Sequence, residues 1–242
     1  MKKYIKSITA LNKLTLSTKN SDEIDRYAES DIFWAANKKK TVQNRFVKKG
    51  DIYQFEFGKN FVPEMSYEHR GLVIGISSKL LYVLPICSYD AELPEHRDVI
   101  HPIDNPESSS NYFLLKGKDY SFLSHDSVLK LNDLRSVSIS RIKYKHKSGH
   151  ISTSSATYRA IEYYAFSKHF PAYSYKYNKL KKQNDKLQKN VSFLQATLDD
   201  IIKMLEEHDT DATCREILQK VVDTCPSVTT SDPAKLPEKV LM

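Results

Sequence analysis

Residues 69–88 read HRGLVIGISSKLLYVLPICS, two apolar runs separated by the polar residues 77–79. Each run is short and rich in aliphatic and β-branched side chains, which is typical of a strand buried in a sheet. A polar link of three residues has the length of a hairpin loop. The sequence therefore predicts a buried antiparallel hairpin that opens at a His-Arg pair and closes on a Cys-Ser pair.

Further short strands are predicted on both sides of this hairpin. Upstream, GDIYQFEF (residues 50–57) alternates, so that Tyr53, Phe55 and Phe57 share one face. Downstream, four apolar runs are separated by Asn, Asp, Pro or Gly, which are the residues of turns. Strands at such short intervals predict a small antiparallel barrel or sandwich over residues 46–142. The four downstream runs are residues 97–103, 111–116, 126–131 and 135–142.

Helical patterns flank the β region. SDEIDRYAESDIFWAANKKK begins with Ser21 as a helix N-cap and ends in three lysines, which suits the two ends of a helix dipole. After the β region, ATYRAIEYYAFSKHF (residues 156–170) has a helical period and is stopped by Pro171. The chain is thus predicted to be an α+β protein. We expect an N-terminal helical segment at 1–46, a barrel domain with a closing helix at 47–170, a coiled-coil and helical extension at 171–225, and a disordered tail at 226–242.

The clearest periodic signal lies in residues 177–205. Apolar residues recur there in alternating steps of three and four, with Leu or Ile at each d position of a heptad and Asn184 at an a position. A single a-position asparagine favours a defined, often two-stranded pairing. We expect a homodimer through this seam; the alternative is that the seam packs within its own chain against the N-terminal helices. The seam comprises Tyr177, Leu180, Asn184, Leu187, Val191, Leu194, Leu198, Ile201 and Leu205.

The composition indicates a globular protein with an anionic partner. Of the 242 residues, 28% are charged and 40% hydrophobic, and 37 Lys and Arg against 30 Asp and Glu give a formal net charge of +7. An excess of cations attracts polyanions, and 15 Tyr and 10 Phe are available to stack on bases. RNA or DNA is therefore the first candidate partner.

The cysteines and the N-terminal residues indicate in which cellular compartment the protein is found. The three cysteines, Cys87, Cys214 and Cys225, are far apart and form no CxxC pair, so neither a disulfide framework nor a thiolate zinc site is indicated. The lysine-containing N-terminal segment lacks the apolar core of a signal peptide, and no stretch is apolar enough to span a membrane. We expect a cytoplasmic protein without a membrane partner.

His69 and Arg70 are the residues best suited to chemistry on RNA. Cleavage of RNA without a metal uses the ribose 2′-hydroxyl as nucleophile, and the site must supply a base, an acid and cationic donors for the phosphate. An imidazole changes charge near neutral pH, and a guanidinium can hold two phosphate oxygens at once. Neighbours in a strand point to opposite faces, so both reach one substrate only at a strand start or in a loop, where this pair is predicted to lie.

Several blocks, in this order, resemble the PemK/MazF toxins of bacterial toxin–antitoxin pairs. The family pattern opens with a Gly-Asp-hydrophobic-aromatic strand, here residues 50–53, followed by a loop with a glutamate, here Glu64. An arginine before an apolar strand, a Pro-x-Thr-Ser/Thr strand end and a late Arg-Thr-Ile-Asp segment complete the pattern. In this chain these blocks are residues 69–71, 85–88 and 135–138.

The resemblance covers roughly residues 47–142 and implies a small SH3-like barrel with endoribonuclease activity on single-stranded RNA. Such proteins leave a cyclic phosphate and a 5′-hydroxyl, need neither metal nor cofactor, act as homodimers and are held inactive by an antitoxin protein. By position, the resemblance makes Arg70 the catalytic arginine, with His69, Cys87 and Ser88 completing the catalytic set. The candidate RNA-binding residues are Arg135, Ser138, Glu64 and Arg141.

Departures from the family pattern leave other functions open. Cys87 stands where the family has threonine, Ser138 replaces the usual aspartate, and Gly71 replaces proline. A serine hydroxyl is a poor proton acceptor near neutral pH. We therefore expect His69, and not Ser138, to transfer the proton. The alternative is a catalytically weak or inactive module that binds nucleic acid or a protein and dimerises through its coiled coil. A gyrase-poisoning toxin on a related barrel is a third hypothesis.

A basic cluster closes the β region. RIKYKHKSGH (residues 141–150) suits phosphate contact, but such runs are more often solvated loops, and we prefer that interpretation. His146 and His150 stand at i and i+4, the spacing of a metal pair on a helix. Gly149 weakens any helix there and no nearby carboxylate completes a ligand set, so no metal site is expected.

Overall fold

The computed structural model describes residues 1–17, 20–39 and 46–207. The chain divides into two compact units, residues 1–175 and 176–242. None of the described helices combines the length and the apolar composition that a bilayer span requires.

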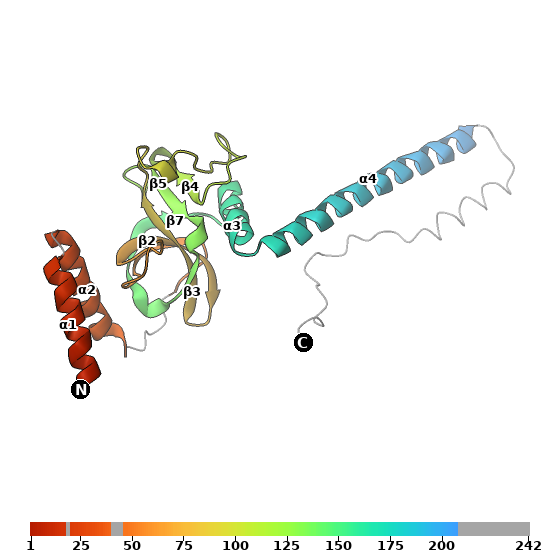
Figure 1. Ribbon diagram of the computed structural model, residues 1–242. Coiled ribbons are helices and arrows are strands. Elements are labelled where there is room, and N and C mark those ends of the chain that lie inside the picture. Colours follow the sequence, from red (N-terminus) through yellow and green to blue (C-terminus); the bar gives the residue numbers. More distant parts are fainter. Residues whose placement is uncertain (18–19, 40–45, 208–242) are drawn as a thin grey trace. The chain divides into compact units, whose positions relative to one another are not determined.

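The first unit is built on an antiparallel sheet of seven strands (Figure 1). Its strand order is β4-β5-β3-β2-β1-β7, and β6 pairs with a different part of β3 from β5. Helices together with this sheet confirm the α+β class. In the described strand pairs, β4, β6 and β7 each pair with one strand, so closure into an SH3-like barrel stays a prediction. The strands are β1 (Asp51–Glu56), β2 (Glu68–Ser77), β3 (Leu80–Ser88), β4 (Tyr112–Leu115), β5 (Ser127–Lys130), β6 (Arg135–Ser138) and β7 (Ile142–His150).

The predicted hairpin is confirmed as β2 and β3. Its ladder extends from the turn, where Ser78 has a φ of +57°, to Arg70 opposite Ile86. β2 begins at Glu68, so His69 and Arg70 both lie inside the paired strand. This placement matters for the site, because side chains alternate as soon as the strand starts.

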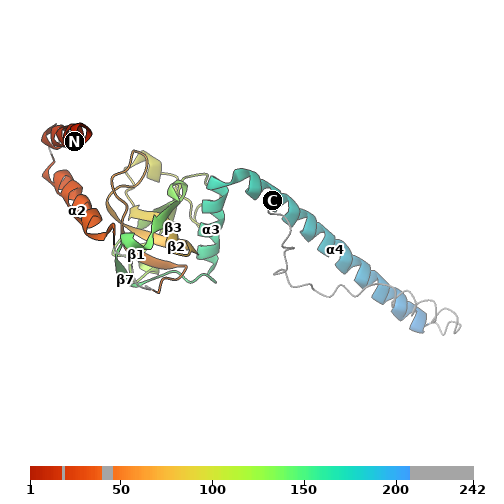
Figure 2. The same cartoon turned by 90° about the horizontal axis from the view of Figure 1, so that it is seen from below.

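Two hydrophobic cores lie on opposite faces of the sheet. As the alternation predicted, Tyr53, Phe55 and Phe57 share a face and pack together in one core. Ile52, on the other face of β1, packs in the second core, which includes side chains of α3 (Ala156–His169), the helix beside the sheet in Figure 2. Full burial of one such side chain contributes about 1.5–3 kcal/mol, so these cores hold the sheet and α3 together.

The helix boundaries near Pro171 agree with the sequence pattern. The side chain of Ser155 accepts a backbone N–H at the start of α3, and α3 ends at His169. Pro171 then begins α4 (Pro171–Glu207), because proline has no N–H to lose at the first helical position. A helix over the heptad seam is therefore confirmed. The rest of the helical extension expected up to residue 225, and the tail expected at 226–242, lie outside the described residues.

Two helices precede the sheet. The N-cap of the second is Asn20 rather than the predicted Ser21, because the Asn20 side chain accepts a helix N–H at 3.0 Å. This helix contacts the sheet through Ser30, whose hydroxyl donates to Oε1 of Glu56 at 2.9 Å between two buried side chains. The helices are α1 (Lys2–Ser17) and α2 (Ser21–Asn37).

Two predictions about the β region are wrong. Residues 97–103 make isolated bridges instead of a strand, and Pro102 supplies no amide to a ladder. The basic cluster at 141–150, expected as a solvated loop, is almost entirely strand β7. Pairing with β1 accounts for it: a partner strand far away in the sequence satisfies the backbone of this polar run.

Candidate active site

Arg70 lies in a row of polar side chains that crosses three strands. Arg70 of β2 is opposite Gln54 of β1, and Gln54 is opposite Tyr144 of β7. Residues opposite each other in an antiparallel pair share a face, so the three side chains project from the same side of the sheet. Arg70 and Gln54 are half-buried and Tyr144 is exposed, which leaves this row accessible to a ligand.

The guanidinium of Arg70 is a cation without an anion. Among the described residues, no carboxylate forms an ion pair with it. Burial lowers the pKa of Arg70, and the phenol of Tyr144 opposes that shift. An arginine nevertheless stays charged in a protein, so a half-buried positive charge faces the row. A phosphate suits this position, because the planar guanidinium can donate to two of its oxygens.

His146 of β7 adds an imidazole beside this cation. Its Nε2 is 2.9 Å from Oε1 of Gln54, and its ring centroid is 5.5 Å from that of Tyr144. Burial, followed by the positive charge of Arg70, lowers the pKa of His146 below its ordinary value of 6.5. The imidazole is therefore neutral at pH 7. Because an amide oxygen only accepts, Nε2 carries the proton and Nδ1 keeps a free lone pair, which makes Nδ1 a proton acceptor.

The four predicted catalytic residues divide between the two faces of the sheet. Neighbours along a strand alternate, so His69 and Arg70 project to opposite faces of β2, and Cys87 and Ser88 to opposite faces of β3. Arg70 is opposite Ile86, two residues before Ser88. Arg70 and Ser88 therefore share one face, and His69 and Cys87 share the other.

His69 lies opposite Phe55, whose side chain belongs to a hydrophobic core. Burial lowers the pKa of His69; the charges of Arg26 and Arg70 act in the same direction, and Glu68 opposes them. His69 is thus a neutral imidazole at pH 7, but the strand directs it away from the face that carries Arg70.

Cys87 and Ser88 have different surroundings. Burial raises the pKa of the Cys87 thiol, and its Sγ is 3.9 Å from the carbonyl oxygen of Val128. Only a thiolate is a strong nucleophile, so Cys87 is a weak one at neutral pH. Ser88 is exposed, and its Oγ is 2.9 Å from Nε2 of His125, whose Nδ1 is 2.9 Å from Oγ of Ser124. Ser88 thus has an imidazole partner other than the predicted one.

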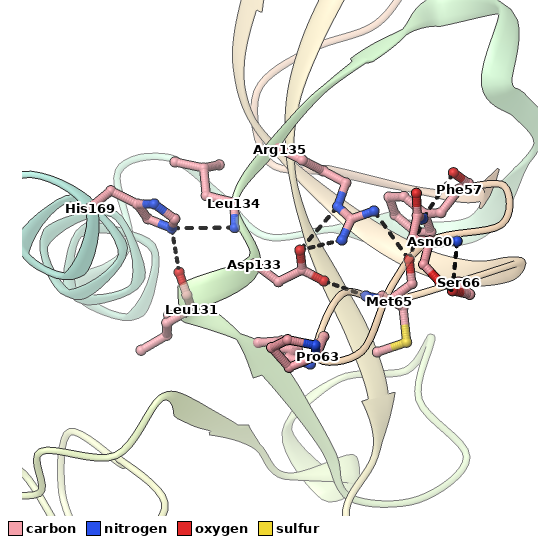
Figure 3. A network of polar contacts seen from close by, with 11 residues as sticks. Phe57, Asn60, Pro63, Met65, Ser66, Leu131, Asp133, Leu134, Arg135 and His169 are labelled. Carbon is pink, nitrogen blue, oxygen red and sulfur yellow. Dashed lines mark hydrogen bonds and ion pairs between the residues drawn. The ribbon is translucent and has the colours of Figure 1, made fainter.

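Arg135 is engaged in a structural network (Figure 3). Its Nε donates to Oδ1 of Asp133 at 3.1 Å, its Nη2 donates to the same oxygen, and its Nη1 donates to the carbonyl of Met65 at 3.1 Å. Oδ2 of Asp133 accepts the Met65 amide at 2.7 Å, and the guanidinium lies 5.3 Å from the centroid of the Phe57 ring. These contacts tie the loop between β1 and β2 to the segment before β6.

Arg141 and Ser138 line a cleft of about 420 Å³ between α2 and the sheet. Nη1 of Arg141 donates to the Glu56 carbonyl at 2.9 Å, and Oγ of Ser138 accepts the Ser140 amide at 3.2 Å. Trp34 of α2, 58% exposed, lines the same cleft. An aromatic ring beside a guanidinium and hydroxyl groups is a combination that binds single-stranded nucleic acid.

Sequence reasoning missed Gln54 and Tyr144 and did not assign His146 a role in proton transfer. The available signal was Gln54, a polar residue between the aromatic residues Tyr53 and Phe55. Its neighbours come from β7, whose strand character the local sequence does not show. Glu64, a predicted RNA contact, is exposed in the β1–β2 loop, where its amide donates to the carbonyl of Phe61.

The two histidines of β7 have separate partners. His146 is bonded to Gln54, whereas Nδ1 of His150 is 3.0 Å from a carboxylate oxygen of Asp51. Over the ranges that the structure describes, no group of three or more His, Cys, Asp or Glu side chains is placed to hold a metal ion.

Comparison with known proteins adds no family assignment. No protein-family model matches the chain, and no curated protein matches it. The resemblance to PemK/MazF toxins is therefore carried by the sequence blocks alone.

Proposed function

We propose that this chain is a metal-independent endoribonuclease of the PemK/MazF kind, which cuts single-stranded RNA on the face that carries Arg70. The observation that supports it is the arrangement on this face, where an unpaired guanidinium lies beside a neutral imidazole. Together they supply the anion binding and the proton removal that such cleavage needs.

Each side chain in the row has a role in this reaction. Nδ1 of His146 removes the proton from the ribose 2′-hydroxyl, and the 2′ oxygen forms a bond to phosphorus. The bond between phosphorus and the 5′ oxygen breaks, and the departing oxygen takes a proton from water. Arg70 binds the phosphate oxygens as their charge grows. Gln54 orients the imidazole, and the ring of Tyr144 can stack on a base.

The test is cleavage of single-stranded RNA by the full-length protein in EDTA, with new 5′-hydroxyl ends labelled by a polynucleotide kinase. Arg70→Ala should lower the rate about 10²–10³-fold, and His146→Ala about 10²–10⁴-fold, with an unchanged circular dichroism spectrum. Arg159→Ala, which removes an exposed arginine of α3, is the matched control and should cleave like the wild type. A wild type that makes no new ends, or an active Arg70→Ala variant, refutes the proposal.

A second candidate is a module that binds RNA or a protein without cutting. It is favoured by the separation of His69 and Cys87 from the face of Arg70, and by Ser138, whose hydroxyl accepts an amide instead of a substrate proton. This function predicts that the protein retains RNA on a filter while both RNA ends stay intact after long incubation.

The partners that follow from the leading proposal are single-stranded RNA, an antitoxin protein that blocks the Arg70 face, and a second copy of the chain. RNA as substrate implies that the protein acts in the cytoplasm. Co-expression with the gene next to its own would identify the antitoxin, because only a true antitoxin suppresses the growth defect that RNA cleavage causes.

A further inference from the structure

α4 carries an apolar seam that is exposed among the residues that the structure describes. Leu180, Leu187 and Leu194 occupy successive d positions and are 61–64% exposed. Heptad spacing places these leucines and the a-position residues along one stripe of the helix. A long stripe of leucine in water is characteristic of a surface that another protein covers.

The occupant that fits this seam is a second copy of the same helix. Gln183 and Asn190 occupy g positions, and Gln188 and Gln195 occupy the e positions that follow them. In a parallel pair, a g residue of one helix faces the e residue five positions later in the other, which here brings amide beside amide. Amides both donate and accept, so self-pairing meets no charge repulsion at these four positions. Lys176 at g and Lys181 at e form a like-charged pair of the same kind that opposes self-pairing, but both are exposed, and exposed charge pairs contribute little. A partner selected by charge has no complementary groups to recognise there.

Asn184 distinguishes the two possible orientations. In a parallel pair in register, it faces Asn184 of the second copy, and each amide can donate to the other. In an antiparallel pair, an a position faces a d position, so Asn184 lies against a leucine and leaves its amide unpaired in an apolar layer. We propose that α4 forms a parallel two-stranded coiled coil with a second copy of this chain, with Asn184 paired to its equivalent.

The charges on the outer face of α4 favour the opposite orientation. Lys179, Lys182 and Lys186 lie in the first half of the helix, whereas Asp199 and Asp200 lie in the second. An antiparallel pair brings these charges closer together. They occupy b, c and f positions, however, which point away from the partner helix, and exposed ion pairs contribute little. The buried amide therefore decides the orientation.

Light scattering on the full-length protein tests the interface. The wild type should have twice the mass of one chain, and Leu187→Lys combined with Leu194→Lys should have the mass of one chain at the same concentration. Phe193→Ser is the matched control, because Phe193 is 70% exposed but occupies a c position outside the seam. It should leave the mass doubled. A wild type with the mass of one chain, or a doubled mass that survives both lysines, overturns the proposal.

Disulfide cross-linking tests the orientation, in a chain whose native cysteines are replaced by serine. Val191→Cys should give a covalent dimer under mild oxidation, because equivalent a positions face each other in a parallel pair and this variant keeps Asn184. Lys182→Cys, at an outer f position, should not. A doubled mass without a cross-link at position 191 refutes the parallel register. Neither readout involves RNA, so either failure leaves the proposed cleavage of RNA to its own test, although a wild type with the mass of one chain removes the second copy from the proposed partners.

Discussion

The ion pair between Asp133 and Arg135 is the contact whose loss should unfold the protein most readily. Both side chains are largely buried, at 9% and 16% exposed, and Asp133 also accepts the amide of Met65. Asp133→Ala removes the anion and leaves a buried guanidinium and a buried amide unpaired. Removing one partner of a buried ion pair costs about 3–5 kcal/mol. Arg135 keeps its bond to the Met65 carbonyl and its contact with Phe57, so we expect about 3 kcal/mol.

Equilibrium unfolding in urea, followed by the near-ultraviolet circular dichroism of the aromatic side chains, measures this loss. With a denaturant slope of about 2 kcal/mol per molar, a loss of about 3 kcal/mol lowers the unfolding midpoint by about 1.5 M. The matched control is Asp31→Ala, which breaks the more exposed ion pair with Lys59. That substitution should cost at most about 1 kcal/mol.

A double replacement distinguishes the contribution of the ion pair to stability from the cost of leaving one buried charge unpaired. Asp133→Leu combined with Arg135→Met removes both charges, and should destabilise the protein less than Asp133→Ala alone, because no buried charge is left unpaired. Suppose instead that Asp133→Ala costs no more than Asp31→Ala. The network of Figure 3 then contributes little to stability, and Arg135 is free to bind RNA as the sequence predicted.

Three other expectations are open to direct measurement. The NMR titration of His146 should have its midpoint below pH 6.5, and Arg70→Gln should raise it, because the guanidinium disfavours a second positive charge. Since the unfolded chain binds this proton more readily than the folded protein, the stability linked to His146 is complete above pH 6.5 and declines as the pH falls below it. Gly50→Ala should cost about 2 kcal/mol or more in urea unfolding, because Gly50 has a φ of +86° and a Cβ there would lie 2.2 Å from the Ile151 carbonyl oxygen. Trp34 is the only tryptophan, so its fluorescence should fall when RNA binds, and Trp34→Ala should weaken binding more than Phe61→Ala, which alters an exposed ring outside the cleft. Unchanged emission with bound RNA would exclude the cleft from the RNA path.

Local patterns in the sequence were enough to predict most of the elements. The alternation in residues 50–57 and the polar link at 77–79 are short-range signals, and both gave the correct strands. Strand β7 could not be predicted in this way, because its residues are polar and their pairing with β1 spans much of the chain. The prediction of a strand at residues 97–103 was wrong for the opposite reason. Their local sequence is apolar enough for a strand, but Pro102 has no amide to complete a ladder.

Sequence reasoning proposed Arg70 as a site residue, but it could not decide which side chains share the face of Arg70. Side chains alternate along a strand, so a shift of one residue in the strand start decides which neighbours meet. Because β2 already includes Glu68, His69 is directed away from Arg70. The imidazole on the same face as Arg70 is His146, and only the register between β1 and β7 brings it there.

Gly71 affects which motions would bring the Arg70 guanidinium onto the phosphate of the proposed RNA substrate. A Cβ on Gly71 would lie 2.4 Å from Cγ1 of Val83 and 2.9 Å from Cδ2 of Phe55. The main chain next to Arg70 is therefore closely packed on the face of the sheet opposite to the Arg70 side chain. This close packing favours movement of the guanidinium by rotation about its own side-chain bonds. Such rotations take picoseconds to nanoseconds, whereas a loop rearranges over nanoseconds to microseconds. The proposed capture of a phosphate by Arg70 would therefore need no slow rearrangement of the backbone.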